Sequence, residues 1–172
     1  MALDGFVFDK RNITSAAWAH YNWIMTGKQD GLTSGCDMTV SGNDVNIADG
    51  YFFIRGRMGI VSGTTTVTAP TVASGTAYCT LVAQIDLTKV NTTDEMKQLT
   101  FEVLTSASTY PSVTQEDLDD GGNIYQVAFA HFDVTANGIS NFTPVIGEVD
   151  TDYIHADQFS YVSGTNSLYL TL

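Results

Sequence analysis

The carboxylates are the side chains of this sequence that come nearest to a catalytic arrangement. Four acids stand within five consecutive positions: Glu116, Asp117, Asp119 and Asp120. Two facing carboxylates are what glycoside hydrolysis requires, and carboxylate oxygens are also ligands for Ca²⁺. The cluster follows Thr114 and precedes Gly121, where a helix N-cap, an acidic first turn and a terminal glycine would use the same residue types. We therefore expect a structural cluster, with glycan cleavage and calcium binding as the open alternatives.

The other groups that could do chemistry are not spaced to act together. His20, His131 and His155 do not match the spacing of a metal site or a catalytic triad, and the motifs H-E-x-x-H and G-x-S-x-G are absent. Asp150 and Asp152 could offer oxygens to Ca²⁺, but no twelve-residue EF-hand loop surrounds them. The sequence therefore predicts no catalytic residue, no cofactor and no metal site, and a protein that is not an enzyme.

The two cysteines point to little redox chemistry. Cys79 lies in a strand pattern, and we expect a buried thiol there, as is common for free cysteine. A disulfide between Cys79 and Cys36 is the alternative, which spacing alone does not decide. No C-x-x-C pair is present to bind a metal.

Two arginines stand out in an acidic chain. Arg55 and Arg57 are two of only seven basic residues, against nineteen acids. Strand alternation places them opposite Phe52 and Ile54, so both arginines should point to the solvent side of one strand. They form either a solvated strand face or an ion-pair site between subunits, because guanidinium groups bind carboxylates in a bidentate manner.

Length and composition indicate a single folded unit. The 172 residues fit one domain, which we divide into an N-terminal arm and helix (1–30) and a β-sandwich domain (31–172). A hydrophobic content of 44% supports a core and argues against global disorder, although only 15% of the residues are charged. The net charge of −12 repels phosphate backbones, so we expect no nucleic-acid partner. We expect no secretory signal, because the first twelve residues contain early acids and no long apolar segment. We expect no membrane insertion, because no run of about 18 apolar residues occurs.

One segment, residues 14–26, carries a helical pattern with Thr14 or Ser15 as its N-cap. An apolar stripe at spacings of three and four consists of Ala17, Trp18, Tyr21, Ile24 and Met25. Trp23 falls off this stripe. The helix packs either on its own domain or on a neighbouring subunit. We expect Trp18 to be buried in its own domain and Trp23 to be available to a partner.

From Cys36 onward the apolar period changes to two, which is typical of half-buried antiparallel strands. The expected inward-facing sets are Val45 and Ile47; Phe52 and Ile54; Cys79, Leu81, Ala83, Ile85 and Leu87; and Leu99, Phe101 and Val103. Many short strands separated by turns favour a mainly β fold. We predict an antiparallel β-sandwich with an N-terminal helix and a short internal helix.

Three local signals refine this fold. Residues 114–117 resemble a helix start, so we expect the internal helix at about 115–120. A change in apolar parity predicts a β-bulge near Ala130 and His131. Residues 161–172 predict a final hairpin, whose shared face would carry Leu168, Leu170 and Leu172.

Five segments occur in a recognisable order: Gly50–Arg57, Tyr78–Leu87, Leu99–Val103, Tyr110–Leu118 and Ile124–Ser140. In this order they resemble small structural proteins from the tails and baseplates of bacteriophages and prophages of Gram-positive bacteria. The first segment is similar to that family's turn into its first long strand, and the last to its final core hairpin. The loop 109–112 with the following T-Q-E-D-L is similar to the family's linking segment. The resemblance spans roughly residues 31–145.

The resemblance implies a non-enzymatic virion protein, made in the bacterial host cytoplasm, that connects or supports host-attachment parts. Its expected partners are further copies of itself, as a homo-oligomer, and other virion proteins. The alternatives are a head-surface protein, a carbohydrate-binding or receptor-binding module of the adhesin type that binds host surface polysaccharide, and a small hydrolase. We expect the interface to include Trp23, Arg55, Arg57, Leu168, Leu170 and Leu172.

Overall fold

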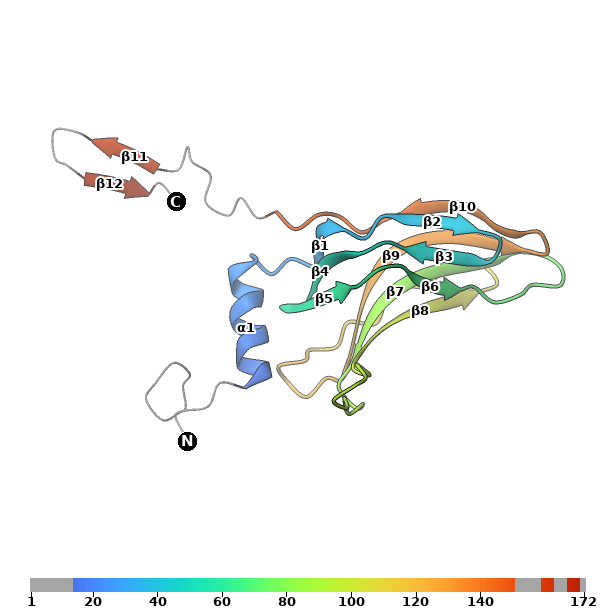
Figure 1. Ribbon diagram of the computed structural model, residues 1–172, viewed down its shortest axis with the longest axis horizontal. Helices are drawn as coiled ribbons and strands as arrows, with labels where there is room; N and C mark the ends of the chain where they lie inside the picture. Colours follow the sequence, from blue (N-terminus) through green and yellow to red (C-terminus); the bar gives the residue numbers. More distant parts are fainter. Residues whose placement is uncertain (1–13, 151–158, 163–166, 171–172) are drawn as a thin grey trace.

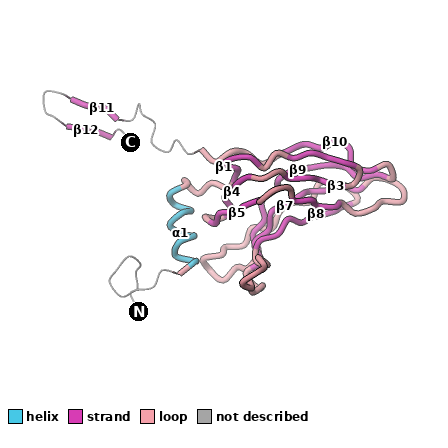
Figure 2. The backbone as a smooth tube through the Cα atoms, in the orientation of Figure 1, coloured by secondary structure: helices cyan, strands magenta, loops and turns pink. Residues whose placement is uncertain are grey.

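The computed structural model describes residues 14–150 together with strands Phe159–Val162 and Ser167–Leu170. Strands make up most of the regular structure, and helix α1 (Ser15–Met25) stands crosswise at one end of them (Figures 1 and 2). The prediction of a mainly β fold with an N-terminal helix is therefore confirmed. Thr14 is the N-cap, since its side chain accepts a hydrogen bond from the Ala17 N–H at 3.1 Å.

The first layer is a three-stranded antiparallel meander that is interrupted in the middle. The interruption divides each long strand into two short ones. The first consists of β1 (Gly31–Gly35) and β2 (Met38–Ser41), the second of β3 (Asp44–Ile47) and β4 (Gly50–Ile54), and the third of β5 (Arg57–Val61) and β6 (Thr65–Thr68). Strands β1, β4 and β5 pair at one end, and β2, β3 and β6 pair at the other. Backbone hydrogen bonds bridge the interruption, from the Cys36 N–H to the Asp49 carbonyl and from the Ala48 N–H to the Asp37 carbonyl. The two short sheets are thus halves of one bent layer.

The second layer is a four-stranded antiparallel sheet in the order β10-β9-β7-β8. Its strands are β7 (Ala77–Asp86), β8 (Leu99–Ser106), β9 (Ile124–Thr135) and β10 (Gly138–Pro144). Leu81 pairs with Ala130 and the next residue, Val82, pairs with Ala128, so Phe129 is an extra residue in β9. The predicted β-bulge is therefore confirmed, one residue before its expected position.

The core lies between the two layers, as a sandwich requires. The Phe129 ring contacts the rings of Phe52 and Phe101 edge-on, with centroids 5.1 Å apart in each case. Cys79 is a fully buried free thiol, as predicted, and Cys36 is also buried and free, so no disulfide joins them. Burial raises the pKa of both thiols, which keeps them protonated and unreactive.

The short internal helix predicted at residues 115–120 is wrong. The chain instead turns at residues 118–121, and Gln115 bridges to Tyr125 of β9. The Glu116 N–H donates to the Ile124 carbonyl, and the Glu116 carboxylate accepts from the Asn123 and Ile124 N–H groups. These hydrogen bonds tie Glu116 to residues 123 and 124 across the turn, so Glu116 does not take part in a helix.

The C-terminal hairpin that the alternation predicted is present. Strands β11 (Phe159–Val162) and β12 (Ser167–Leu170) pair antiparallel, with Phe159 opposite Leu170. They form a two-stranded sheet of their own. Leu168 and Leu170 lie in β12, whereas Leu172 lies outside the described residues.

Candidate functional site

The β4–β5 hairpin places both arginines next to helix α1. Ile54 pairs with Arg57, so Arg55 and Gly56 form a two-residue turn. Both turn residues have positive φ, 48° for Arg55 and 72° for Gly56, which is the type I′ geometry that matches strand twist. Arg55 therefore sits in the turn rather than on the solvent face of a strand, and only Arg57 begins β5.

Arg55 binds within its own chain. Its guanidinium donates to Asp119 at 2.9 Å and to Asp117 at 3.3 Å, and the Arg55 side chain is only 14% exposed. The same guanidinium lies over the Trp23 ring, 4.8 Å from its centroid. The ion-pair site that the sequence suggested for Arg55 is thus formed by carboxylates of the same chain.

Asp30 also binds the β4–β5 turn, through the backbone of Arg55. The sequence alone did not point to this residue. The Arg55 N–H donates to Asp30 Oδ1 at 2.6 Å, and the Tyr125 hydroxyl donates to Asp30 Oδ2 at 2.8 Å. Burial raises the pKa of Asp30, although these hydrogen bonds oppose the rise. Burial and the hydrogen bond to Asp30 also raise the pKa of the Tyr125 phenol. The sequence gives no sign that Asp30 and Tyr125 form a pair, because 95 positions separate them.

Helix α1 packs on this hairpin through its smallest residues. Ala19 is buried, and a Cβ added at Gly56 would lie 1.9 Å from the Ala19 carbonyl oxygen. The helix therefore approaches the turn as closely as a glycine permits. The predicted roles of the two tryptophans are reversed: Trp23 is half-buried under Arg55, whereas Trp18 is 47% exposed.

The apolar stripe of α1 consequently faces away from the sandwich. Its large members are each about half exposed: Trp18, Tyr21, Ile24 and Met25. The rings of Trp18 and Tyr21 meet edge-on with centroids 5.9 Å apart. We call this set the outer stripe of α1. Helical periodicity identified its residues correctly and its direction wrongly.

A second exposed apolar surface lies on the outer face of β4 and β5. Tyr51 pairs with Ile60, and Phe53 pairs with Met58, so these four side chains share one face. Tyr51, Met58 and Ile60 are each about half exposed. Both exposed surfaces lack charged side chains, although the chain as a whole carries a net charge of −12.

Arg57 has a different environment from Arg55. Its guanidinium donates to the Arg55 carbonyl at 3.3 Å, and among the described residues it forms no ion pair within 4.0 Å. Burial lowers the pKa of Arg57, an effect that the charge of nearby Asp119 opposes. Of the two arginines, Arg57 is the one whose guanidinium has no carboxylate partner among the described residues.

The acidic cluster has structural roles in this fold. Backbone hydrogen bonds from Asn123 and Ile124 lower the pKa of Glu116. Asp119 accepts from the Arg55 guanidinium and lies 3.1 Å from His20 Nδ1. Within the described ranges, no three His, Cys, Asp or Glu side chains gather as a metal site requires.

The remaining histidine in the described part, His131, belongs to a polar network on β7 and β9. Its ring stacks on Tyr110 at 4.7 Å, and its Nδ1 lies 3.1 Å from the Thr80 hydroxyl. Because that hydroxyl donates to the Pro111 carbonyl, the His131 Nδ1–H is the donor to it. The network fastens the loop 107–114 to the sheet. His155 lies outside the described residues.

Comparison with known protein sequences supplies no relative of this chain. No protein-family model matches the sequence, and no curated protein is significantly similar to it. In the described part of the chain, no helix is long and apolar enough to cross a membrane.

Proposed function

We propose that this protein is a non-enzymatic structural component of a bacteriophage virion, which connects or supports host-attachment parts of a tail or baseplate. It acts by binding further copies of itself and other virion proteins. The observation that supports this proposal best is the outer stripe of α1, in which Trp18, Ile24 and Met25 are each about half exposed. The virion role in this proposal rests on the resemblance of residues 31–145 to tail and baseplate proteins.

The size of the outer stripe limits how strongly it binds on its own. Four half-exposed large side chains present roughly 100 Å² each, so a symmetric pair of stripes would bury about 800 Å². Specific interfaces usually bury about 1,200–2,000 Å². We therefore expect weak self-association of the isolated protein, in the micromolar range, and tighter binding when partner proteins add contact area.

Sedimentation velocity over a concentration series tests this proposal. We expect wild-type protein to self-associate, and a Trp18→Glu, Ile24→Glu variant to remain monomeric because it places charges in the stripe. Val90→Glu is the matched control, since Val90 is exposed in the β7–β8 loop, away from the stripe. A wild-type protein that is strictly monomeric at high micromolar concentration, or a control that dissociates as fully as the double variant, would contradict the proposal.

The non-enzymatic part of the proposal rests on three of the four clustered carboxylates, Glu116, Asp117 and Asp119, which are bonded in the turn or in the α1 contact. We expect no cleavage of host cell-wall glycan or surface polysaccharide by the purified protein. Cleavage that is lost on Glu116→Gln or Asp117→Asn would overturn this assignment. Glycan binding without cleavage receives less support, because the two aromatic rings of the outer sheet face, Tyr51 and Phe53, stand opposite aliphatic Ile60 and Met58, and Phe53 is partly buried.

A further inference from the structure

A groove runs between strands β5 and β8. It consists of two adjoining hollows of about 410 Å³ and 250 Å³, which share Met96 and Leu99. The first hollow begins at Ser15 and Ala16 of α1, and the second ends at Val61 and Thr65. The combined size is typical of a ligand site rather than of a packing defect.

The walls of the groove are mostly apolar. The lining side chains of this kind are Phe52, Met58, Ile60, Val61, Ile85, Leu87, Met96, Leu99 and Phe101. Asn91 and Gln98 also line it, but their amides bond to each other at 3.0 Å, and the Gln98 amide nitrogen donates to the Lys89 carbonyl. These polar groups are therefore already satisfied within the chain.

Free strand edges flank the groove on both sides. β5 ends the order β1-β4-β5, and β8 ends the order β10-β9-β7-β8. Within the described residues, neither edge pairs with a further strand, so each presents unbonded N–H and C=O groups. β6 comes close to β8 and limits the groove at its far end.

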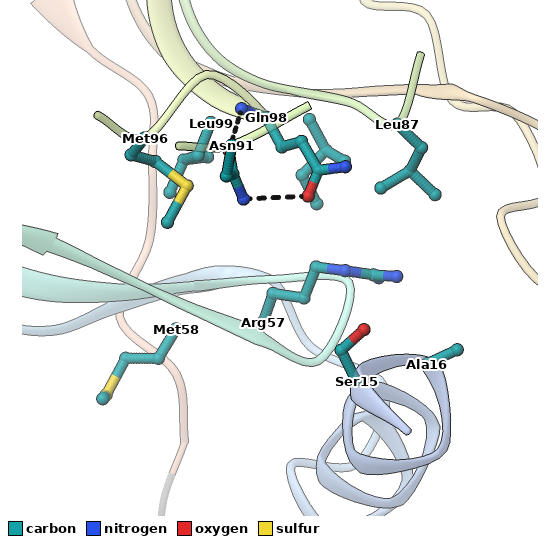
Figure 3. A pocket seen from close by; sticks show the side chains of 10 residues that line it. Ser15, Ala16, Arg57, Met58, Leu87, Asn91, Met96, Gln98 and Leu99 are labelled. Atoms are coloured by element: carbon teal, nitrogen blue, oxygen red, sulfur yellow. Dashed lines mark hydrogen bonds between the residues drawn. The ribbon is translucent and has the colours of Figure 1, made fainter. Parts of the chain in front are cut away.

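Arg57 occupies the near end. Its side chain extends between Ser15 and Ala16 on one side and Gln98 and Leu87 on the other (Figure 3). The guanidinium is half-buried and bonded only to a carbonyl among the described residues, while neighbouring Asp119 is held by Arg55 and His20. A carboxylate from outside would give this cation a partner that the described residues do not provide.

We propose that this groove binds an extended peptide segment of a partner protein, with an Asp or Glu of the segment on Arg57 and apolar side chains in the hollows. The proposal takes from the proposed function only that the protein works by binding other proteins. The carboxylate follows from Arg57, and the peptide, rather than a free aliphatic acid, follows from the two strand edges that could pair with its backbone. β5 spans five residues, which sets the length of the segment at about five.

Fluorescence anisotropy with a labelled probe, acetyl-Glu-Thr-Val-Thr-Leu-amide, in which Glu, Val and Leu share one face of the extended chain, tests the site. We expect saturable binding to wild-type protein, weakened about tenfold or more by Arg57→Gln and by Gln in place of Glu in the probe. The two changes should not add, because both remove the same contact. N-methylation of alternate probe amides should weaken binding by a similar factor, since it blocks pairing with a strand edge.

Three further measurements make the test decisive. Lys28→Gln, which removes one positive charge away from the groove, should bind as wild type does. Met96→Asp should weaken binding without unfolding, because Met96 is exposed and lines both hollows. The Trp18→Glu, Ile24→Glu variant should still bind the probe, so failure of self-association and failure of the groove can be told apart. Absence of probe binding, equal binding of the Glu and Gln probes, or binding of sodium octanoate in place of the peptide would overturn the proposal.

Discussion

The two sides of helix α1 differ in composition in a way that hydrophobicity alone does not explain. The inner side contacts the β4–β5 turn through the small Ala19 and through the Trp23 ring under Arg55. The outer side carries four large apolar side chains and faces away from the sandwich. Close backbone packing on Gly56 and the Arg55 contact thus orient the helix more strongly than its apolar stripe does. The stripe that loses this competition remains about half exposed.

The largest loss of stability should result from Gly56→Ala, because the added methyl group has no room between the turn and α1. A Cβ there meets the Ala19 carbonyl oxygen at 1.9 Å, and φ is 72°, so both the helix contact and the turn are strained. We expect the free energy of unfolding, measured by urea denaturation, to fall by about 3–4 kcal/mol.

Gly42→Ala is the matched control for this prediction. Gly42 has a φ of 62°, but a Cβ there meets nothing within 4 Å. It should cost only about 1 kcal/mol, the backbone share of the effect. Equal losses for the two variants would mean that the helix does not press on the turn.

The next largest effect should separate the two tryptophans. Trp23→Ala removes a half-buried ring and its contact with Arg55, so we expect a loss of about 2–3 kcal/mol. Trp18→Ala should change the free energy of unfolding by less than about 0.5 kcal/mol, because Trp18 lies in the outer stripe. Thermal and urea denaturation of both variants measure this difference. The reverse order would show that α1 is turned the other way round.

The tryptophans also show how far the sequence can predict this fold. Period-two alternation identified the strands at residues 45–47, 78–87 and 99–103, because burial on one face of a sheet is encoded locally. The direction of α1 could not be read in this way. It depends on which surface the helix meets, and Gly56 lies 37 positions beyond Ala19 in the chain. A glycine in a short turn after an alternating strand was the one available signal for close approach.

The candidate sites were also predictable only in part, because their surroundings depend on residues far apart in the sequence. Arg55 and Arg57 stood out by rarity, but their different surroundings depend on Asp117, Asp119 and Asp30, which the fold brings from distant segments. The internal helix failed because Glu116 satisfied the backbone of residues 123 and 124 instead of its own turn. Local propensity does not register such non-local partners.

The two arginines should differ in stability by a smaller amount. Arg55→Gln removes two carboxylate contacts and the Trp23 contact, and we expect a loss of about 1–2 kcal/mol after allowing for the exposure of Asp117. Arg57→Gln should cost less than about 0.5 kcal/mol. Arg55→Lys should recover only part of the loss, since an ammonium group lacks the planar fork. Urea denaturation compares the three variants, and a greater loss for Arg57→Gln would contradict the assignment of Arg57 to an external ligand.

The smallest effect should appear as a pH dependence of the inner contact. Burial alone would raise the pKa of Asp119, but the hydrogen bond with His20 and the charge of Arg55 outweigh it and hold that pKa below 3.8. Because the pKa is lower in the folded state than in the unfolded state, ionised Asp119 stabilises the fold above about pH 4, and this contribution is lost as the pH falls further. Wild type should therefore exceed Asp119→Asn in the free energy of unfolding by less than about 1 kcal/mol near neutral pH, and the difference should vanish towards about pH 2. Asp120→Asn is the control, since the Asp120 side chain forms no hydrogen bond or ion pair with the described residues. A difference between wild type and Asp119→Asn that stays constant down to pH 2 would show that the carboxylate does not help to hold α1 against the hairpin.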